Sequence, residues 1–115
     1  RGFIFGPLLA ERLGIGFVPI RKPNKLPHSK IKIEYSLEYG TNTLEIHEDA
    51  LTQGQKIIII DDLLATGGTI SACAELCLKL GVEILGSLFL IELIGLDARK
   101  KLSPIPVHSL LQYPA

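Results

Sequence analysis

The chain has 115 residues, of which 47% are hydrophobic, and its formal net charge is zero. This length predicts one globular domain with a buried core. The balanced charge excludes a global electrostatic attraction to nucleic acid or to an anionic membrane. No apolar run reaches the roughly 18 to 20 residues that span a bilayer, and the N-terminal stretch, with an early proline and the charged Glu11 and Arg12, is not typical of a signal peptide.

Cys73 and Cys77 are the only cysteines. They lie four residues apart in a helical pattern, so they share a helix face but are poorly placed for a disulfide. Without nearby histidines they are too few for a structural zinc site. We therefore expect two buried free thiols and a cytoplasmic protein.

The first elements are predicted to be a helix, a short strand and a basic loop. Apolar residues recur at helical spacing over residues 2–13, and Gly14 ends the helix. Residues 15–20 are apolar and predict a strand, with Pro19 at its exit. The next segment, from Arg21 to Lys32, holds five Lys or Arg residues and no acid, so it predicts a basic loop.

A β-hairpin is predicted to follow this loop. Residues 31–39 alternate strictly between apolar and polar side chains, residues 40–43 ("GTNT") have turn chemistry, and residues 44–47 alternate again. We expect the loop and hairpin to form one flexible segment, residues 21–47, within a single domain that comprises residues 1–115.

The second half of the chain alternates strands with a helix. Residues 56–60 form a continuous β-branched run, typical of a strand buried on both faces. Residues 70–80 have a helical pattern, residues 83–93 read as a second buried strand, and residues 107–111 as a third. A strand, helix and strand in this order predict an α/β fold with a parallel central sheet flanked by helices.

The stretch "IIIIDDLLATGGT" places two negative charges and a loop of small side chains where the first of these strands ends. Ligands of open parallel sheets bind beyond the carboxyl ends of the strands, and Asp61 and Asp62 are expected there. The loop Ala65-Thr66-Gly67-Gly68-Thr69 leads into a helix, whose N-terminal N–H groups, with glycines and hydroxyls, predict a phosphate cradle. The carboxylates suit hydroxyl groups or Mg²⁺ beside the phosphate, which together indicate a ribose 5-phosphate.

A purely structural role is the alternative for each part of this stretch. Either aspartate can cap a helix, and two glycines can form only a turn. The ordered combination of strand, aspartate pair and Thr-Gly-Gly-Thr at a helix start favours function over that alternative.

This stretch resembles the motif that binds 5-phosphoribosyl 1-diphosphate in the type I phosphoribosyltransferase family. Together with "RGFIFG", "IRKPNKLP", "YSLEYG" and "SLLQY", it is similar to the members of that family that use adenine. The resemblance implies the family fold and the formation of AMP and pyrophosphate from adenine and 5-phosphoribosyl 1-diphosphate, in purine salvage. It also implies Mg²⁺ held mainly by the substrate, and a homodimer.

The resemblance also implies roles for individual residues. Residues 65–69 hold the 5-phosphate, and Asp61 and Asp62 hold the ribose hydroxyls. Glu38 assists proton transfer at adenine N7, with Tyr39 beside it. The cationic residues near the pyrophosphate are Arg1, Arg21, Lys22 and Lys25. From their place at the end of a predicted strand, Glu92 and Leu93 are further candidates for lining the base pocket.

Several alternatives stay open at this point. The chain has no methionine, and the family fold starts before Arg1, so we expect a truncated chain that lacks an N-terminal strand and the hood over the base and is weakly active or inactive alone. Other readings are a transferase for hypoxanthine, xanthine or orotate, a non-catalytic module that binds the diphosphate sugar, and a truncated product that only dimerises.

Overall fold

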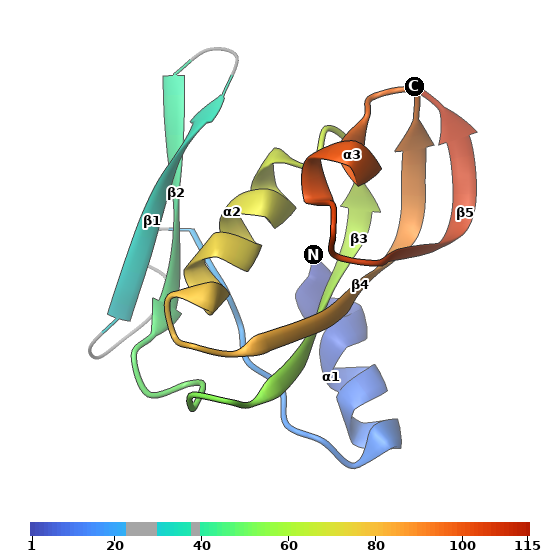
Figure 1. The fold of residues 1–115 in the computed structure, drawn as a ribbon. Helices are drawn as coiled ribbons and strands as arrows, with labels where there is room; N and C mark the ends of the chain where they lie inside the picture. Colours follow the sequence, from blue (N-terminus) through green and yellow to red (C-terminus); the bar gives the residue numbers. More distant parts are fainter. Residues whose placement is uncertain (23–29, 38–39) are drawn as a thin grey trace.

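A computed structural model of the chain describes residues 1–22, 30–37 and 40–115 (Figure 1). The candidate residues Lys25, Glu38 and Tyr39 therefore lie outside the described residues, and their roles stay predictions. The elements in chain order are α1 (Gly2–Leu13), β1 (Lys30–Leu37), β2 (Gly40–His47), β3 (Lys56–Leu64), α2 (Gly68–Leu78), β4 (Glu83–Ile94), α3 (Ala98–Leu102) and β5 (Val107–Pro114).

The strands form the two sheets that the sequence predicts. One sheet has the order β3-β4-β5 and is parallel at both pairings, with helix α2 connecting β3 to β4. The other is the antiparallel hairpin of β1 and β2. The expected α/β class with a parallel sheet, flanking helices and a hairpin is therefore confirmed. None of the helices in the described ranges is long and apolar enough to cross a bilayer.

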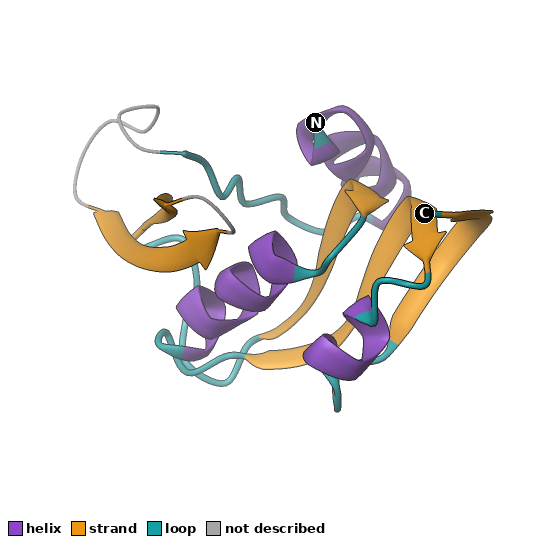
Figure 2. Cartoon of the chain, turned by 90° about the horizontal axis from the view of Figure 1, so that it is seen from above, coloured by secondary structure: helices purple, strands orange, loops and turns teal. Residues whose placement is uncertain are grey.

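Helix α2 lies at the centre of the molecule. Figure 2 shows it between the hairpin and the three-stranded sheet, with α1 on the opposite face of that sheet. A helix with neighbours on two sides must be apolar around most of its surface. Its buried residues are Ile70, Ala72, Cys73, Ala74, Leu76 and Cys77. The two cysteines are free and buried, as expected.

The hairpin confirms the predicted alternation but not the predicted turn. Ile33 is buried and Tyr35 is half-buried on the side that packs on α2, whereas Lys32 is exposed. The turn expected at residues 40–43 is wrong, because these residues start β2 and pair with residues 34–37 of β1. Pairing provides hydrogen-bond partners for the backbone groups of this segment, which outweighs the turn propensity of Gly, Asn and Thr.

Other boundaries also differ from prediction. Residues 15–20, which the structure describes, form no strand; the chain makes one β-bridge at Arg21, which exchanges backbone hydrogen bonds with Glu45. Helix α2 begins and ends two residues earlier than expected, and β5 continues to Pro114. Helix α3 was not predicted, since its five residues are too few to show a helical period.

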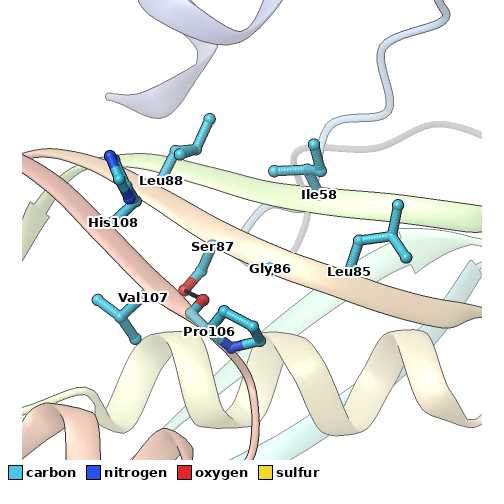
Figure 3. Close-up of a pocket in the computed structure, with 8 residues that line it drawn as sticks. All are labelled: Ile58, Leu85, Gly86, Ser87, Leu88, Pro106, Val107 and His108. Atoms are coloured by element: carbon cyan, nitrogen blue, oxygen red, sulfur yellow. Dashed lines mark hydrogen bonds between the residues drawn. The ribbon is translucent and has the colours of Figure 1, made fainter.

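One face of the three-stranded sheet is only partly covered. Helix α1 approaches the sheet at Ile60 through its small residue Gly6, while its apolar residue Leu8 stays exposed. The expectation that β3 is buried on both faces is therefore wrong at Ile58, which is 46% exposed. A hollow of about 320 Å³ is lined by residues of β3, β4 and β5 together with Pro106, and Figure 3 shows that Ile58 and Leu85, which line it, extend to the same side of the strands.

The central position of α2 makes its buried leucine important for stability. We expect Leu76→Ala to lower the free energy of unfolding by about 2–5 kcal/mol, because it leaves a cavity between the sheet and the hairpin. Leu78→Ala is the matched control, since Leu78 is 54% exposed on the same helix and Leu76 is fully buried. Denaturant unfolding measures both variants; equal losses would contradict the central role of α2.

Candidate functional site

The two aspartates lie inside strand β3 and not after it. The strand was expected to end at Ile60, but it continues through Asp61 and Asp62 to Leu64. It does so because β4 also continues, so that Leu64 pairs with Glu92 and the backbone groups of both strands find partners. Both aspartates are half-buried close to the carboxyl end of the sheet, which is where parallel sheets bind ligands.

The Asp61 carboxyl group is held in a partly buried position. Its Oδ1 accepts a hydrogen bond of 2.9 Å from the backbone N–H of Asp62. Burial raises the pKa of Asp61 above its ordinary value; this hydrogen bond opposes the shift, and the neighbouring Asp62 carboxylate adds to it. A pair of close, partly desolvated carboxylates favours an incoming hydroxyl donor or cation, because either would relieve their repulsion.

The start of α1 lies directly against these aspartates. Arg1 Nε is 3.4 Å from Asp62 Oδ2, and the Arg1 side chain is 79% exposed. An ion pair this exposed contributes little to stability, so a ligand can displace it without a large penalty. The structure thus brings the candidate Arg1 to the candidate aspartates.

Gly2 is the residue that permits this close approach. A Cβ atom there would lie 2.8 Å from the carbonyl oxygen of Ile60 and 3.0 Å from Oδ1 of Asp61. Any side chain would therefore push the first turn of α1 away from the strand. The role of Gly2 cannot be predicted from the sequence, because nothing local in a glycine at a helix start indicates what the helix packs against.

The loop from Ala65 to Gly67 turns the chain from β3 into α2. Gly67 is the N-cap of α2 and has φ 87° and ψ 0°, in the left-handed region that favours glycine. The N-cap residue Gly67 has no side chain to cap this helix end, and no acidic residue lies in its first turn. The N-terminal N–H groups therefore present a partial positive charge, which is the arrangement expected of an anion site.

Threonine hydroxyls surround this helix end. Thr66 and Thr69 are exposed, and Thr66 Oγ1 accepts a long hydrogen bond of 3.4 Å from the Gly68 N–H. The Tyr35 hydroxyl of β1 lies 3.4 Å from Thr69 Oγ1. The hairpin therefore contacts the predicted phosphate loop, a contact that periodicity within β1 does not reveal.

The two other candidate cations that the structure describes, Arg21 and Lys22, lie away from the aspartates. Arg21 is positioned by its backbone hydrogen bonds to Glu45 of β2, and Lys22 follows it as an exposed residue. Both are next to the hairpin, while Arg1 is at the aspartates. Their predicted role at a pyrophosphate stays a prediction.

Glu92 is buried and fully engaged within the protein. It is 4% exposed, and its carboxylate accepts hydrogen bonds from Arg99 Nε at 2.9 Å and Nη2 at 2.8 Å. Ser109 Oγ and Gln112 Nε2 donate to the same carboxylate at 2.8 and 3.2 Å. Mainly because of the hydrogen bonds from Arg99, the pKa of Glu92 falls from the usual 4.5 to about 2.

Glu92 and the half-buried Leu93 also line a cavity of about 320 Å³. The cavity lies at the carboxyl end of β4, beside α3. Because the Glu92 oxygens already have protein donors, contact of these two residues with a base stays a prediction.

Comparison with known proteins places this geometry in a family. The model of the phosphoribosyl transferase domain matches residues 1–106. The adenine phosphoribosyltransferase of Carboxydothermus hydrogenoformans is 57% identical over 113 residues, which are 98% of this chain and 66% of that protein. The chain thus spans just under two thirds of the length of this relative.

Solved structures have the same fold. The crystal structure of adenine phosphoribosyltransferase from Thermoanaerobacter pseudethanolicus is 56% identical, with a TM-score of 0.95 over 98% of this chain and 66% of that one. The enzyme from Saccharomyces cerevisiae, in complex with adenine and an imino-altritol bisphosphate, is 47% identical, with a TM-score of 0.88 over 93% of this chain and 60% of that one.

The close approach at Gly2 predicts a local destabilisation. We expect Gly2→Ala to lower the free energy of unfolding by about 1–3 kcal/mol, because the new methyl group meets backbone atoms that cannot rotate away. Gly16→Ala is the control, since a Cβ at Gly16 meets nothing within 4 Å. Thermal unfolding of both variants checks this. A Gly2→Ala variant as stable as the wild type would mean that α1 does not pack on β3 as described.

The depressed pKa of Glu92 predicts a pH-dependent contribution to stability. A carboxyl group with a lowered pKa in the folded state stabilises the protein above its unfolded pKa, and this contribution is lost as the pH falls through the folded value. We therefore expect the stability advantage of the wild type over Glu92→Gln to shrink between pH 4.5 and about 2. Urea unfolding at pH 5 and pH 3 measures the free energy of unfolding of both proteins, with Glu75→Gln, at an exposed residue, as the control. A difference between wild type and Glu92→Gln that is the same at both pH values would contradict the lowered pKa of Glu92.

Proposed function

The chain belongs to the phosphoribosyltransferase family, and we propose that its protein is an adenine phosphoribosyltransferase, which makes AMP and pyrophosphate from adenine and 5-phosphoribosyl 1-diphosphate. The observation that carries the proposal is the juxtaposition of two half-buried aspartates with the N-terminus of α2, whose N-cap is Gly67. This arrangement suits a ligand with a phosphate at one end and hydroxyl groups nearby. The similarity to adenine enzymes over 98% of the chain supports adenine as the base.

In this proposal, α2 and β3 together bind the ribose 5-phosphate. The phosphate lies at residues 65–69, where backbone N–H groups and the hydroxyls of Thr66 and Thr69 donate to its oxygens. Asp61 and Asp62 accept hydrogen bonds from the ribose hydroxyls, which also stabilises their close negative charges. The glycines matter because a side chain in this loop would occupy space that the phosphate needs.

The reaction replaces pyrophosphate with adenine at the anomeric carbon. A bond forms between the base nitrogen and that carbon, and the bond from the carbon to the pyrophosphate oxygen breaks. Negative charge grows on the departing pyrophosphate, so cations near it stabilise the transition state. We assign this role to Arg1, Arg21, Lys22 and Lys25. The weak, exposed ion pair of Arg1 with Asp62 supports this for Arg1, because its guanidinium is free to turn towards a ligand.

We propose that Mg²⁺ arrives with the substrate. Among the residues that the structure describes, no group of three or more His, Cys, Asp or Glu side chains is arranged to hold a metal. Mg²⁺ often keeps several waters and binds through one or two carboxylates together with substrate phosphates. Asp61 and Asp62 fit that limited role, and the ion when bound adds positive charge beside the leaving pyrophosphate.

The hairpin is proposed to control proton transfer and water access. Glu38 assists proton transfer at adenine N7, with Tyr39 next to it in the sequence. The contact between Tyr35 and Thr69 supports a hairpin that responds to the occupant of the phosphate loop. Closure would exclude water, which otherwise hydrolyses the activated ribose. We further propose a cytoplasmic homodimer, on the family resemblance.

A direct assay tests this function. We expect the full-length protein to form AMP from adenine, 5-phosphoribosyl 1-diphosphate and Mg²⁺, and Asp62→Asn to lower kcat/KM by about 10²-fold, because one charge beside the ribose is lost. Asp49→Asn is the control, since Asp49 is an exposed acid in the turn after β2. Chromatographic separation of AMP from adenine gives the rate.

The same assay separates the alternatives. Faster reaction with hypoxanthine, xanthine or orotate would reassign the base. Binding of the diphosphate sugar without any product would indicate a non-catalytic module. Unchanged turnover in Glu38→Gln would remove the proposed proton-transfer role of the hairpin.

A further inference from the structure

The ion pair of the buried Glu92 with the half-exposed Arg99 joins three elements, β4, α3 and β5. Glu92 is in β4, Arg99 is in α3, and Arg99 Nη1 also donates a hydrogen bond of 3.0 Å to the backbone oxygen of Val107 in β5. Ser109 and Gln112 of β5 complete the set of donors to the carboxylate. The bidentate contact fixes the direction of Arg99 as well as its distance, because the guanidinium and the carboxylate are both planar.

Helix α3 depends on this ion pair for its place. It has five residues, and helices this short are not stable by themselves. Its other buried attachments are the side chains of Ala98 and Leu102. Arg99 is therefore the only side chain of α3 with a described hydrogen bond to both neighbouring strands.

Ala98 of α3 lies against Gly67 of the predicted phosphate loop. A Cβ at Gly67 would lie 3.3 Å from both Cα and Cβ of Ala98, the residue directly before Arg99. Gly67 is buried, and its left-handed conformation sets the direction in which the first N–H groups of α2 point. A shift of Ala98 therefore leaves Gly67 without its backing on that side.

We propose that Glu92 and Arg99 are positioning residues for the 5-phosphate: their ion pair fixes α3, and Ala98 of α3 holds Gly67 in the conformation that presents the α2 N-terminus to the phosphate. The inference rests on the proposed function for the identity of the ligand. It gives Glu92 a role through Arg99 and Gly67, in place of direct contact with the base.

Measurements on Arg99→Gln test the inference. We expect the KM for 5-phosphoribosyl 1-diphosphate and the Kd for ribose 5-phosphate to rise about tenfold, equivalent to about 1.4 kcal/mol. The KM for adenine should change by less than about twofold, because only the phosphate end of the site loosens. Calorimetry gives the Kd at a temperature where circular dichroism shows that the variant is folded.

Two further variants separate positioning from charge and from folding. Lys101→Gln removes one positive charge from the same helix without touching the network, and we expect its Kd for ribose 5-phosphate to match the wild type within about twofold. The double variant Glu92→Gln/Arg99→Gln should bind no more weakly than Arg99→Gln alone, because the two residues act as one unit.

Each outcome has a defined meaning. An unchanged Kd in folded Arg99→Gln, an equal loss in Lys101→Gln, or an equal rise in the KM for adenine would each overturn the inference. If the wild type binds ribose 5-phosphate but forms no AMP, the proposed function fails, and the tenfold weakening in Arg99→Gln still supports positioning. If the wild type does not bind ribose 5-phosphate, both are overturned.

Discussion

The left-handed turn at Gly67 is the constraint on which the candidate site depends. At this residue the chain leaves the carboxyl end of β3 and enters α2 with φ 87°, and the N-cap glycine offers no side chain to the first N–H groups of the helix. Residues with a Cβ adopt this conformation at a cost of about 1–2 kcal/mol, and here a Cβ would also crowd Ala98. The backbone conformation of Gly67 thus sets the direction of the first N–H groups of α2, and with it the partial positive charge that a ligand meets.

The aspartates add the second half of the same constraint. Strand pairing holds Asp61 and Asp62 half-buried near the sheet edge, where burial and mutual repulsion raise the pKa of Asp61. Two close carboxylates are unfavourable in an empty site, and a ligand that brings hydroxyl donors or a cation relieves that repulsion. Favourable interactions are therefore available to the ribose hydroxyls of a ligand as well as to its phosphate. Gly2 also lets Arg1 approach the same carboxylates.

The local sequence was sufficient for features that are local in origin. Periodicity predicted α1 and the hairpin strands, and the order of the "DDLLATGGT" segment predicted a helix start beside two carboxylates. It was insufficient where pairing across the chain decides the result: β3 continues past Ile60 because β4 continues beside it, and residues 40–43 pair instead of turning. The contacts of Gly2 with Ile60 and of Tyr35 with Thr69 join residues far apart in sequence, and no periodicity encodes them.

The ion pair of Glu92 and Arg99 is a contact of this kind, between residues of β4 and α3. An ion pair with one half-exposed partner contributes only modestly to stability, so stability alone is a weak reason for its presence. What charge and planarity add is a fixed orientation, since Arg99 contacts both Glu92 and the Val107 carbonyl. A five-residue helix needs that orientation more than a long one does, because it has few other contacts to hold it. Within this helix, Ala98 lies against Gly67 of the phosphate loop. The proposed positioning of the loop therefore depends on the Glu92 carboxylate, although the ligand need not touch that carboxylate.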